Sequence, residues 1–229
     1  MFKNRTEAGK KLAAALLEYK SEQPLVLALP RGGVPVANEV AAALDAPLDV
    51  IVVRKLGAPG QPELGIGAVV DGDHPQSVLN EDVMSLLHVS TAYLEREVAE
   101  ELREIRRRQQ RYRGGRPPAA IEDHTVIVVD DGIATGGSMR AALRGVRRAQ
   151  PRRLVLAVPV APPETIAALQ SEADAIVCLS TPEFFHAVGQ FYADFTQTTD
   201  EEVIELLEAA RQRYEASRAA SATRRTHEP

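Results

Sequence analysis

The chain has 229 residues, with 27 Lys and Arg against 32 Asp and Glu, a formal charge of −5, and 45% hydrophobic residues. This composition predicts one globular domain with a core that needs no metal or disulfide, and it excludes disordered, collagen-like and disulfide-rich proteins. The single cysteine, Cys178, cannot form an intramolecular disulfide, and the first residues lack the apolar core of a signal peptide. The apolar runs are far shorter than the roughly 18 residues of a membrane span. We therefore expect a cytoplasmic protein without a membrane or nucleic-acid partner.

A first helix is expected near the beginning of the chain. Thr6 can cap it, and Leu12, Leu16 and Tyr19 recur at helical spacing up to a turn at Pro24.

Continuous apolar runs follow and predict buried strands. They cover residues 25–29, 48–53, 126–129, 154–160 and, more weakly, 175–179. Runs that are continuous rather than alternating suit strands covered on both faces. Helical stretches lie at about 34–44, 138–149, 163–172 and 200–215. This alternation predicts an α/β fold with a doubly wound, mainly parallel sheet.

The segment from about 57 to 124 breaks this rhythm and is interpreted as a helical insertion. It opens with a Gly/Pro-rich loop, GAPGQPELG, and continues with a hairpin around Asp71, Gly72 and Asp73. A long helix at about 91–112 then carries an apolar stripe that can pack on a neighbour.

The end of that helix is strongly basic. Between residues 103 and 116 only Glu104 offsets the positive charge of Arg103, Arg106, Arg107, Arg108, Arg111, Arg113 and Arg116. One interpretation is a solvated face that complements the negative end of the helix dipole. The other is a surface that grips an anionic ligand or a neighbouring subunit.

The C-terminal part predicts a small hood and a tail. A hood over the site is expected at about 181–216, and the chain from Ser217 to Pro229 has no apolar content and is expected to be disordered. We therefore expect a single domain over residues 1–216.

The first candidate site follows the strand at 25–29. The strand breaks at Pro30, Arg31, Gly32 and Gly33 and continues into a helix. Glycine N–H groups, a helix N-terminus and a guanidinium together can bind an anion. A Gly-Gly turn between strand and helix also occurs for packing reasons alone.

The second candidate site follows the strand at 126–129. Asp130 and Asp131 end the strand, and a loop then opens a helix. Its residues are Ala134, Thr135, Gly136, Gly137 and Ser138. Hydroxyls and glycine N–H groups at a helix start are suited to a terminal phosphate, and the carboxylates can accept hydrogen bonds from vicinal hydroxyls. An Asp pair can also be a turn with a helix cap, but the loop that follows favours a sugar phosphate.

Other nucleotide-binding motifs are absent. The chain lacks GxxxxGK[ST], and Gly65, Gly67 and Gly72 do not have the spacing or the following helix of a dinucleotide fingerprint. Neither an ATPase nor a dehydrogenase is favoured.

At these residues the sequence resembles the type I phosphoribosyltransferases. VIVVDDGIATGGS, residues 126–138, matches their signature of four hydrophobics, two acids, two hydrophobic or small residues and T-G-x-[ST]. Gly132 departs from it, since an aliphatic residue is usual there. PRGG at 30–33 is similar to the family's pyrophosphate loop, and Arg54-Lys55 to the entry of its flexible catalytic loop. More narrowly, the layout is similar to predicted phosphoribosyltransferases with a helical insertion after the second strand.

The resemblance implies transfer of a 5-phosphoribosyl group from 5-phosphoribosyl 1-pyrophosphate to a nucleophile, with loss of pyrophosphate. Residues 134–138 would then hold the 5-phosphate, and Asp130 and Asp131 the ribose hydroxyls. Arg31, Gly32 and Gly33 would hold pyrophosphate with Mg²⁺, which binds through the substrate near the two aspartates and needs no direct protein ligand.

The same resemblance gives Arg54 and Lys55 the task of offsetting the charge of the departing pyrophosphate. The loop at 57–67 or the arginine-rich helix end is the expected lid. It also implies a cis peptide bond between Pro30 and Arg31.

The acceptor is less defined. Hypoxanthine/guanine-type members have an acid at the position of Ala134, so this specificity is disfavoured, whereas adenine- and uracil-type members can have Ala there. Phe185 and Tyr192, within an aromatic-rich stretch at 181–195, are candidate acceptor-hood residues. Stacking on an acceptor base and packing of the C-terminal helix onto the sheet are both open for these rings.

Two function classes remain open at this point. The first is an enzyme, a phosphoribosyltransferase with an unassigned acceptor, which the presence of Arg54-Lys55 favours. The second is a regulatory protein that binds phosphoribosyl pyrophosphate without turnover. A homodimer is the favoured assembly.

Overall fold

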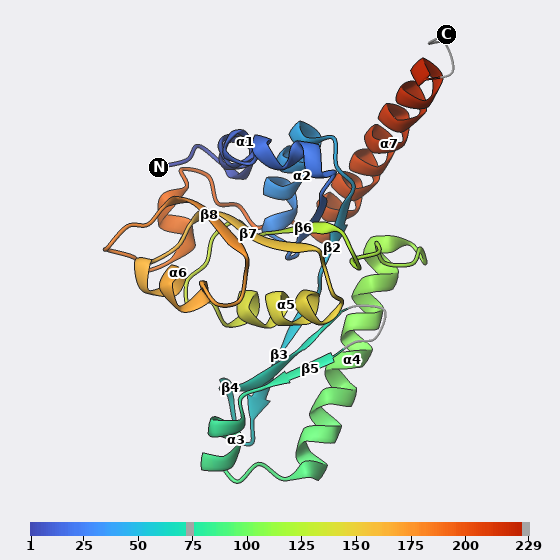
Figure 1. The fold of residues 1–229 in the computed structure, drawn as a ribbon. Helices are drawn as coiled ribbons and strands as arrows, with labels where there is room; N and C mark the ends of the chain where they lie inside the picture. The colour runs from blue at the N-terminus through green and yellow to red at the C-terminus, as the bar shows by residue number, and fades with distance from the viewer. Residues whose placement is uncertain (72–75, 226–229) are drawn as a thin grey trace.

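A five-stranded parallel sheet forms the centre of the computed structural model, which describes residues 1–71 and 76–225 (Figure 1). The strand order is β2-β1-β6-β7-β8. The strands are β1 (Leu25–Ala28), β2 (Leu48–Val50), β6 (Thr125–Val129), β7 (Arg153–Val160) and β8 (Ala175–Ser180). Each predicted strand is therefore present, and all four pairings in this sheet are parallel.

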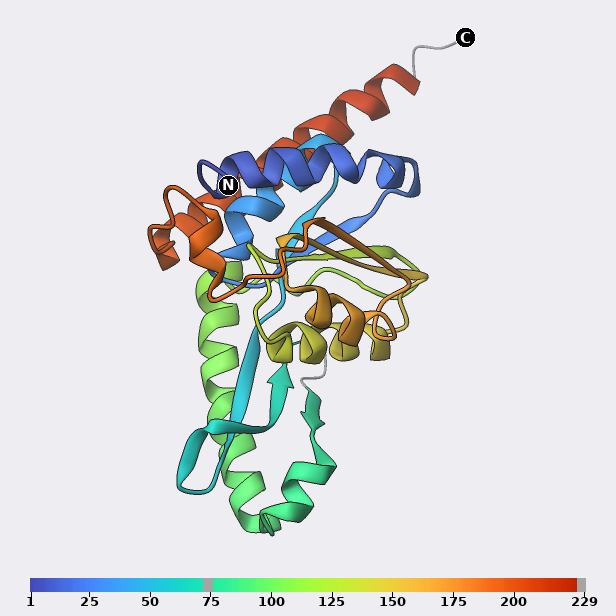
Figure 2. The same cartoon turned by 90° about the vertical axis from the view of Figure 1, so that its left-hand side faces the viewer.

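Helices cover both faces of this sheet. One face carries α1 (Arg5–Ala15), α2 (Gly33–Leu44) and α7 (Asp200–Arg225), and the other carries α5 (Gly137–Arg148) and α6 (Pro163–Leu169) (Figures 1 and 2). In β1, Val26 and Ala28 join the core on the first face, and Leu25 and Leu27 join the core on the second. Burial on both faces explains the continuous apolar runs and confirms the doubly wound fold.

The first helix differs in detail from the prediction. Asn4, not Thr6, caps α1, because its side-chain oxygen accepts a hydrogen bond from the Glu7 N–H at 3.0 Å. The helix ends at Ala15, and a 3₁₀ helix, η1 (Leu17–Glu22), carries Tyr19 into the core.

The apolar run at 48–53 is split between two sheets. The Ile51 N–H still bonds to Ala28 of β1, whereas the Val52 carbonyl accepts from Asp71, next to β4. From Val53 the chain is β3 (Val53–Ala58), which pairs with β4 (Gln61–Val70) and not with β1. Arg54-Lys55 therefore lies inside a strand and not at the end of one.

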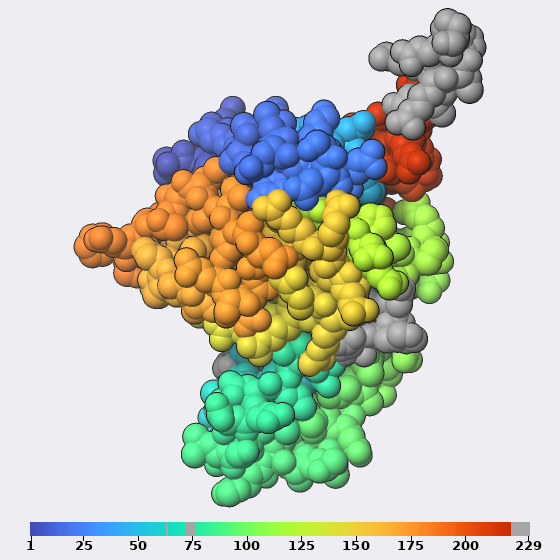
Figure 3. All heavy atoms as spheres, viewed as in Figure 1, coloured from blue at the N-terminus to red at the C-terminus, as the bar shows by residue number. Residues whose placement is uncertain are grey.

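The insertion is mixed rather than helical. It contains a three-stranded antiparallel sheet, β3-β4-β5, with β5 at Gln76–Leu79, as well as α3 (Glu81–Leu86) and α4 (Thr91–Arg113). Figure 3 shows it as a lobe below the sheet domain. The hairpin predicted around Asp71 is present as the β4–β5 pair, but residues 72–75 lie outside the described residues.

The Gly/Pro-rich segment is a hairpin and not an open loop. Pro59 and Gly60 connect β3 to β4, and Gly60 has a φ of +71°. Proline followed by a residue with positive φ is the requirement of a type II turn. Proline and glycine therefore make the turn here, and the flanking residues pair as strands.

The chain from Ser217 does not begin a disordered tail at that residue, because α7 continues to Arg225. Alanine and arginine, which are frequent in this stretch, are strong helix formers. Between β8 and α7, the 3₁₀ helix η2 (Val188–Phe191) forms part of the predicted hood. Within residues 1–71 and 76–225, no helix has the length and apolar character needed to cross a membrane.

Candidate functional site

The two predicted anion loops lie at the carboxyl ends of neighbouring strands. Residues 30–33 follow β1 and residues 130–138 follow β6, and β1 pairs directly with β6. The helices that follow, α2 and α5, pass to opposite faces of the sheet (Figure 1). This is the switch point of a doubly wound sheet, where such folds bind their ligands.

The two loops are in direct contact. A Cβ atom added to Gly32 would lie 2.1 Å from Oδ2 of Asp131, and one added to Gly33 would lie 2.8 Å from the Val129 carbonyl oxygen. Glycine is therefore required at both positions by close approach. The peptide bond between Pro30 and Arg31 is cis, as the resemblance implied. The sequence thus assembles both loops into one site.

The carboxylates of this site are shielded from solvent. Asp131 is buried, and Asp130 is half-buried and accepts a hydrogen bond from the Asp131 N–H at 2.8 Å. Burial, followed by the charge of Asp131, raises the pKa of Asp130 well above its usual value. Burial also raises the pKa of Asp131, although its ion pair with Arg5 opposes the shift. Keeping these carboxylates charged away from solvent therefore costs free energy, which a bound ligand can offset.

The predicted phosphate loop, residues 134–138, leads into the start of α5. Gly136 caps α5 with a φ of +79°, which glycine adopts without strain. Thr135, Gly137 and Ser138 are exposed at the start of the helix, with the N-terminal end of the helix dipole behind them. The Thr165 hydroxyl donates to the Ala134 carbonyl oxygen at 2.7 Å and fixes the loop to α6.

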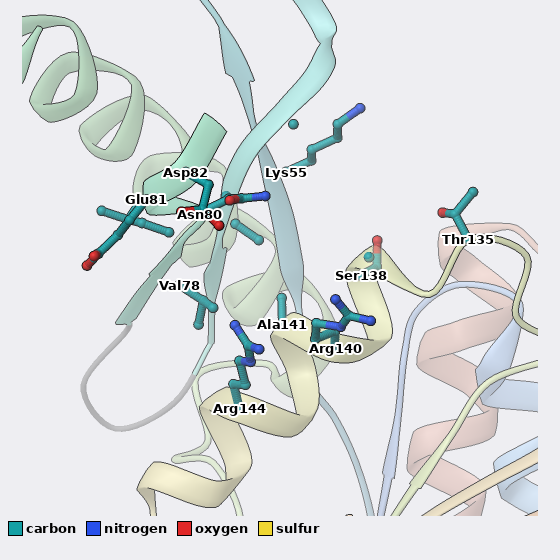
Figure 4. A pocket seen from close by; sticks show the side chains of 15 residues that line it. Lys55, Val78, Asn80, Glu81, Asp82, Thr135, Ser138, Arg140, Ala141 and Arg144 are labelled. Carbon is teal, nitrogen blue, oxygen red and sulfur yellow. The ribbon is translucent and has the colours of Figure 1, made fainter. Parts of the chain in front are cut away.

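A cavity of about 710 Å³ connects the phosphate loop to the insertion. Lys55 and Asn80 come from the insertion, and Thr135, Ser138 and Arg140 face them from the loop and α5 (Figure 4). A Cβ atom at Gly65 would lie 3.0 Å from Cε of Lys55, so glycine there leaves room for the lysine side chain. Lys55 therefore lies on the wall of the same cavity as Thr135 and Ser138.

Arg54 lies elsewhere. Its guanidinium donates to both carboxylate oxygens of Glu101 on α4, at 2.6 and 3.3 Å, and it is not among the residues that line the cavity. Successive side chains of a strand point to opposite faces. The structure thus brings Lys55, but not Arg54, to the phosphate loop.

Arg31 and the arginine-rich helix end meet at one aspartate. Asp200, at the start of α7, lies 3.9 Å from Arg31, 2.8 Å from Arg111, and accepts a hydrogen bond from the Tyr112 hydroxyl at 2.6 Å. Burial and this hydrogen bond raise the pKa of Tyr112 to about 12.

Four other arginines of this end also pair with carboxylates. Arg107 and Arg108 bind Glu104, Arg116 binds Glu208 of α7, and Arg113 is buried. The basic helix end therefore joins α4 to α7 and to the sheet domain.

The candidate hood packs on the N-terminal segment. Tyr192 is 5% exposed, its ring lies 5.4 Å from that of Phe2, and its hydroxyl donates to the Asp131 carbonyl oxygen at 2.5 Å. Phe185 is half-buried and lies 5.0 Å from Phe191. Neither of the two sequence-based interpretations included this packing against residues at the start of the chain.

Gly132, the departure from the signature, has a packing role. A Cβ atom there would lie 2.6 Å from Cγ1 of Val188 in η2 and 3.0 Å from Cγ1 of Val160. The glycine lets the hood approach the Asp131 loop closely.

A family model for the phosphoribosyl transferase domain matches residues 2–196. The chain belongs to this family. The match covers every strand of the parallel sheet and the segments 30–33 and 130–138.

Two proteins are similar to this chain over most of its length. "Putative phosphoribosyl transferase Rv0571c" of Mycobacterium tuberculosis is 46% identical over 210 residues, which are 92% of this chain and 47% of that protein. The chain thus spans about half the length of that relative. The crystal structure of TT1426 from Thermus thermophilus has 48% identity and a TM-score of 0.80, and the match covers 90% of this chain and 97% of TT1426.

Some residues of the candidate site have no signal in the sequence. Arg5 reaches Asp131 from 126 positions away, and Thr165 reaches the phosphate loop from the next helix. Neither lies in a motif, so only the fold brings them to the site. An arginine directly after a helix cap, at the start of an amphipathic helix, is the one local feature at Arg5.

Proposed function

We propose that this protein transfers a 5-phosphoribosyl group from 5-phosphoribosyl 1-pyrophosphate to a base-like or other small nucleophile. In this reaction the bond from the ribose C1 to the pyrophosphate oxygen breaks, a bond from C1 to the acceptor forms, and the acceptor loses a proton. The contact between Gly32 and Asp131 is the observation that carries the proposal, because it joins the two anion loops into one site.

Each loop has a part of the donor to bind. Thr135, Ser138 and the N–H groups at the start of α5 would hold the 5-phosphate. Asp130 and Asp131 would accept hydrogen bonds from the two ribose hydroxyls. Arg31, with the N–H groups of residues 32 and 33, would hold the pyrophosphate, next to the carboxylate of Asp200.

Lys55 would offset the charge that builds on the departing pyrophosphate. It lies on β3 of the insertion and faces the phosphate loop across the cavity. A cation in a site that excludes water stabilises such charge more than it would in solvent. Closure of the insertion over the donor would bring this ammonium group closer. Arg54 would support that movement through Glu101 rather than contact the donor.

Magnesium fits this site as a partner of the donor. Among the described residues no cluster of three His, Cys, Asp or Glu side chains is arranged for a metal. Mg²⁺ prefers oxygen ligands and would take them from substrate oxygens and water, close to the carboxylates of Asp130 and Asp131 but not bound to them directly. When bound, it would neutralise pyrophosphate charge.

We assign the acceptor to a class of compounds and not to a single compound. Ala134 places no acid at the loop position that hypoxanthine/guanine-type enzymes use, which favours adenine- or uracil-like acceptors or a non-base nucleophile. Tyr192 is buried against Phe2, so the half-buried Phe185 is the stronger candidate for stacking on an acceptor ring.

The test is release of pyrophosphate from the donor with Mg²⁺ across purine, pyrimidine and non-base acceptors. We expect acceptor-dependent release by the wild type and loss of at least about tenfold in Asp131→Asn, which removes a charge-assisted hydrogen bond to the ribose. Release that is the same in this variant would contradict the role of Asp131.

A donor-binding regulatory protein without turnover is the alternative. The ion pair that holds Arg54 away from the cavity favours it, since binding alone needs only the two loops. Tight donor binding with no release for any acceptor would support this alternative. A homodimer remains a prediction that sedimentation of the full chain can test.

A further inference from the structure

Arg5 is held against the carboxylate of Asp131 by three contacts. Its Nε donates to Oδ2 of Asp131 at 2.7 Å, and one terminal nitrogen donates to the Thr196 carbonyl oxygen, also at 2.7 Å. The guanidinium carbon lies 3.9 Å from the centre of the Phe195 ring. The side chains of Arg5 and Asp131 are only 11% and 12% exposed. A guanidinium fixed in this way has little freedom to leave the carboxylate.

The backbone that carries Arg5 is also fixed to the hood. The Phe2 N–H donates to the Phe191 carbonyl oxygen at 2.7 Å, and the Ala193 N–H donates to the Phe2 carbonyl oxygen at 2.8 Å. The Asp194 N–H donates to the Lys3 carbonyl oxygen at 2.9 Å. From the hood itself, the Tyr192 hydroxyl donates to the main chain of Asp131. The start of the chain, the hood and Asp131 thus form one connected unit.

This contact leaves room for a ligand on Asp131. Arg5 contacts Oδ2, and a carboxylate offers about four acceptor positions on its two oxygens. A ribose hydroxyl can therefore bind while Arg5 stays in place. Burial alone would favour an uncharged, freely rotating carboxyl group, which is a poorer acceptor. The cation opposes both effects.

We propose that Arg5 is a positioning residue that fixes the orientation in which the carboxylate of Asp131 accepts the ribose hydroxyls of the donor. The inference rests on the proposed function, since it assigns a ribose to this carboxylate. It adds the N-terminal helix and the Phe195 ring to the residues on which donor recognition depends.

The experiment compares two ligands that share the pyrophosphate group but differ in the ribose. Calorimetric titrations with 5-phosphoribosyl 1-pyrophosphate and with inorganic pyrophosphate, both with Mg²⁺, are made on the full chain. In Arg5→Gln we expect the donor dissociation constant to rise about tenfold, in line with loss of a charge-assisted hydrogen bond. The dissociation constant of inorganic pyrophosphate should change by less than about twofold, because that ligand has no ribose.

Further variants separate positioning from a general effect on folding. Arg5→Lys keeps the charge but not the planar contact with Phe195, and Phe195→Leu removes only the ring; we expect each to weaken donor binding about threefold. Combined with Asp131→Asn, Arg5→Gln should add no further loss. Lys10→Gln, which removes an exposed cation from the same helix, should bind both ligands as the wild type does.

Three results would overturn the inference. In the first, Arg5→Gln binds the donor like the wild type. In the second, it loses affinity for the donor and for inorganic pyrophosphate to the same extent, which indicates a structural role alone. In the third, the wild type itself does not bind the donor, which would overturn the proposed function and this inference with it. Should Arg5→Gln fail to fold, Phe195→Leu gives the same comparison.

Discussion

At the scale of single residues, the site is built from groups that are unfavourable without a ligand. Asp130 and Asp131 are adjacent carboxylates removed from water, and Arg5 partners only the second of them among the contacts described above. Binding sites commonly hold such groups at the expense of stability. Removing one charge should therefore stabilise the ligand-free fold.

Asp130→Asn tests this expectation. Burial and the charge of Asp131 raise the pKa of Asp130 in the folded state, so the folded protein binds the proton more tightly than the unfolded chain does. The stability that this proton gives is present at low pH and is lost as the pH rises through the raised pKa. At pH 7 we expect the melting temperature of the variant to lie roughly 2–4 °C above that of the wild type. At about pH 3.5 we expect the two melting temperatures to be equal. A lower melting temperature at pH 7 would contradict this account.

Lys55 and Arg54 provide a second test, because they are neighbours on opposite faces of β3. Lys55→Ala should lower turnover about 10²- to 10³-fold while donor affinity changes by less than about threefold, since the charge of the leaving group develops only in the transition state. Arg54→Ala should mainly lower the melting temperature, because Arg54 binds Glu101 of α4. Unchanged turnover in Lys55→Ala would remove its assigned role.

At the scale of elements, the sequence is most informative where the structural cause is local. Strand–helix alternation and the motifs at 30–33 and 130–138 reflect burial and turn chemistry within a few residues, and the structure has these elements where they are expected. The run at 48–53 predicts one strand, which is wrong because apolar content does not show where a strand changes its partner. The hairpin formed by β3 and β4 is not predicted, because the Gly and Pro residues at 57–65 indicate a loop.

The residues of the candidate site also divide into those that a local motif predicts and those that depend on tertiary packing. Its carboxylates and glycines lie in contiguous motifs, whereas Arg5 and Thr165 are brought to the site by packing between distant parts of the chain. The sequence does not predict that the side chains of Arg54 and Lys55 point in opposite directions, because this requires knowing that both residues lie within a strand.

The phosphate loop gives a prediction at this scale. Gly136 has a φ of +79°, and a Cβ atom there would lie 3.0 Å from Cγ2 of Thr165, whereas a Cβ atom on Gly137 would meet nothing within 4 Å. Gly136→Ala should therefore lower the free energy of unfolding by about 1–2 kcal/mol. Gly137→Ala, one residue later in the helix, should be neutral or slightly stabilising. Denaturant unfolding of both variants measures this, and equal effects would argue against the loop geometry.

At the scale of the whole molecule, a buried ion cluster joins the insertion to the sheet domain. Arg113 at the end of α4 contacts Asp49 of β2 at 2.9 Å and Asp71 after β4 at 3.0 Å, and it donates to the Val50 carbonyl oxygen at 2.7 Å. Its side chain is 8% exposed. The end of α4 is therefore anchored both to β2 of the parallel sheet and to the residue that follows β4.

Arg113→Ala should destabilise the protein by about 3–5 kcal/mol, because the buried Asp71 and the half-buried Asp49 lose their cation. Arg107→Ala is the matched control on the same helix. That arginine is 56% exposed and pairs with Glu104, so its loss should change the free energy of unfolding little. Guanidinium chloride unfolding of the two variants distinguishes them. Similar effects would indicate that Arg113 is not the anchor.

The loops after β1 and β6 are proposed to form one donor site. Calorimetric titration of 5-phosphoribosyl 1-pyrophosphate with Mg²⁺ is the direct test of this claim. We predict saturable binding, one donor per chain, by the wild type. We also predict at least about a tenfold loss in a folded Gly32→Ala variant, whose added methyl group would fall 2.1 Å from Oδ2 of Asp131. No binding by the wild type, or equal binding by both proteins, would contradict the claim.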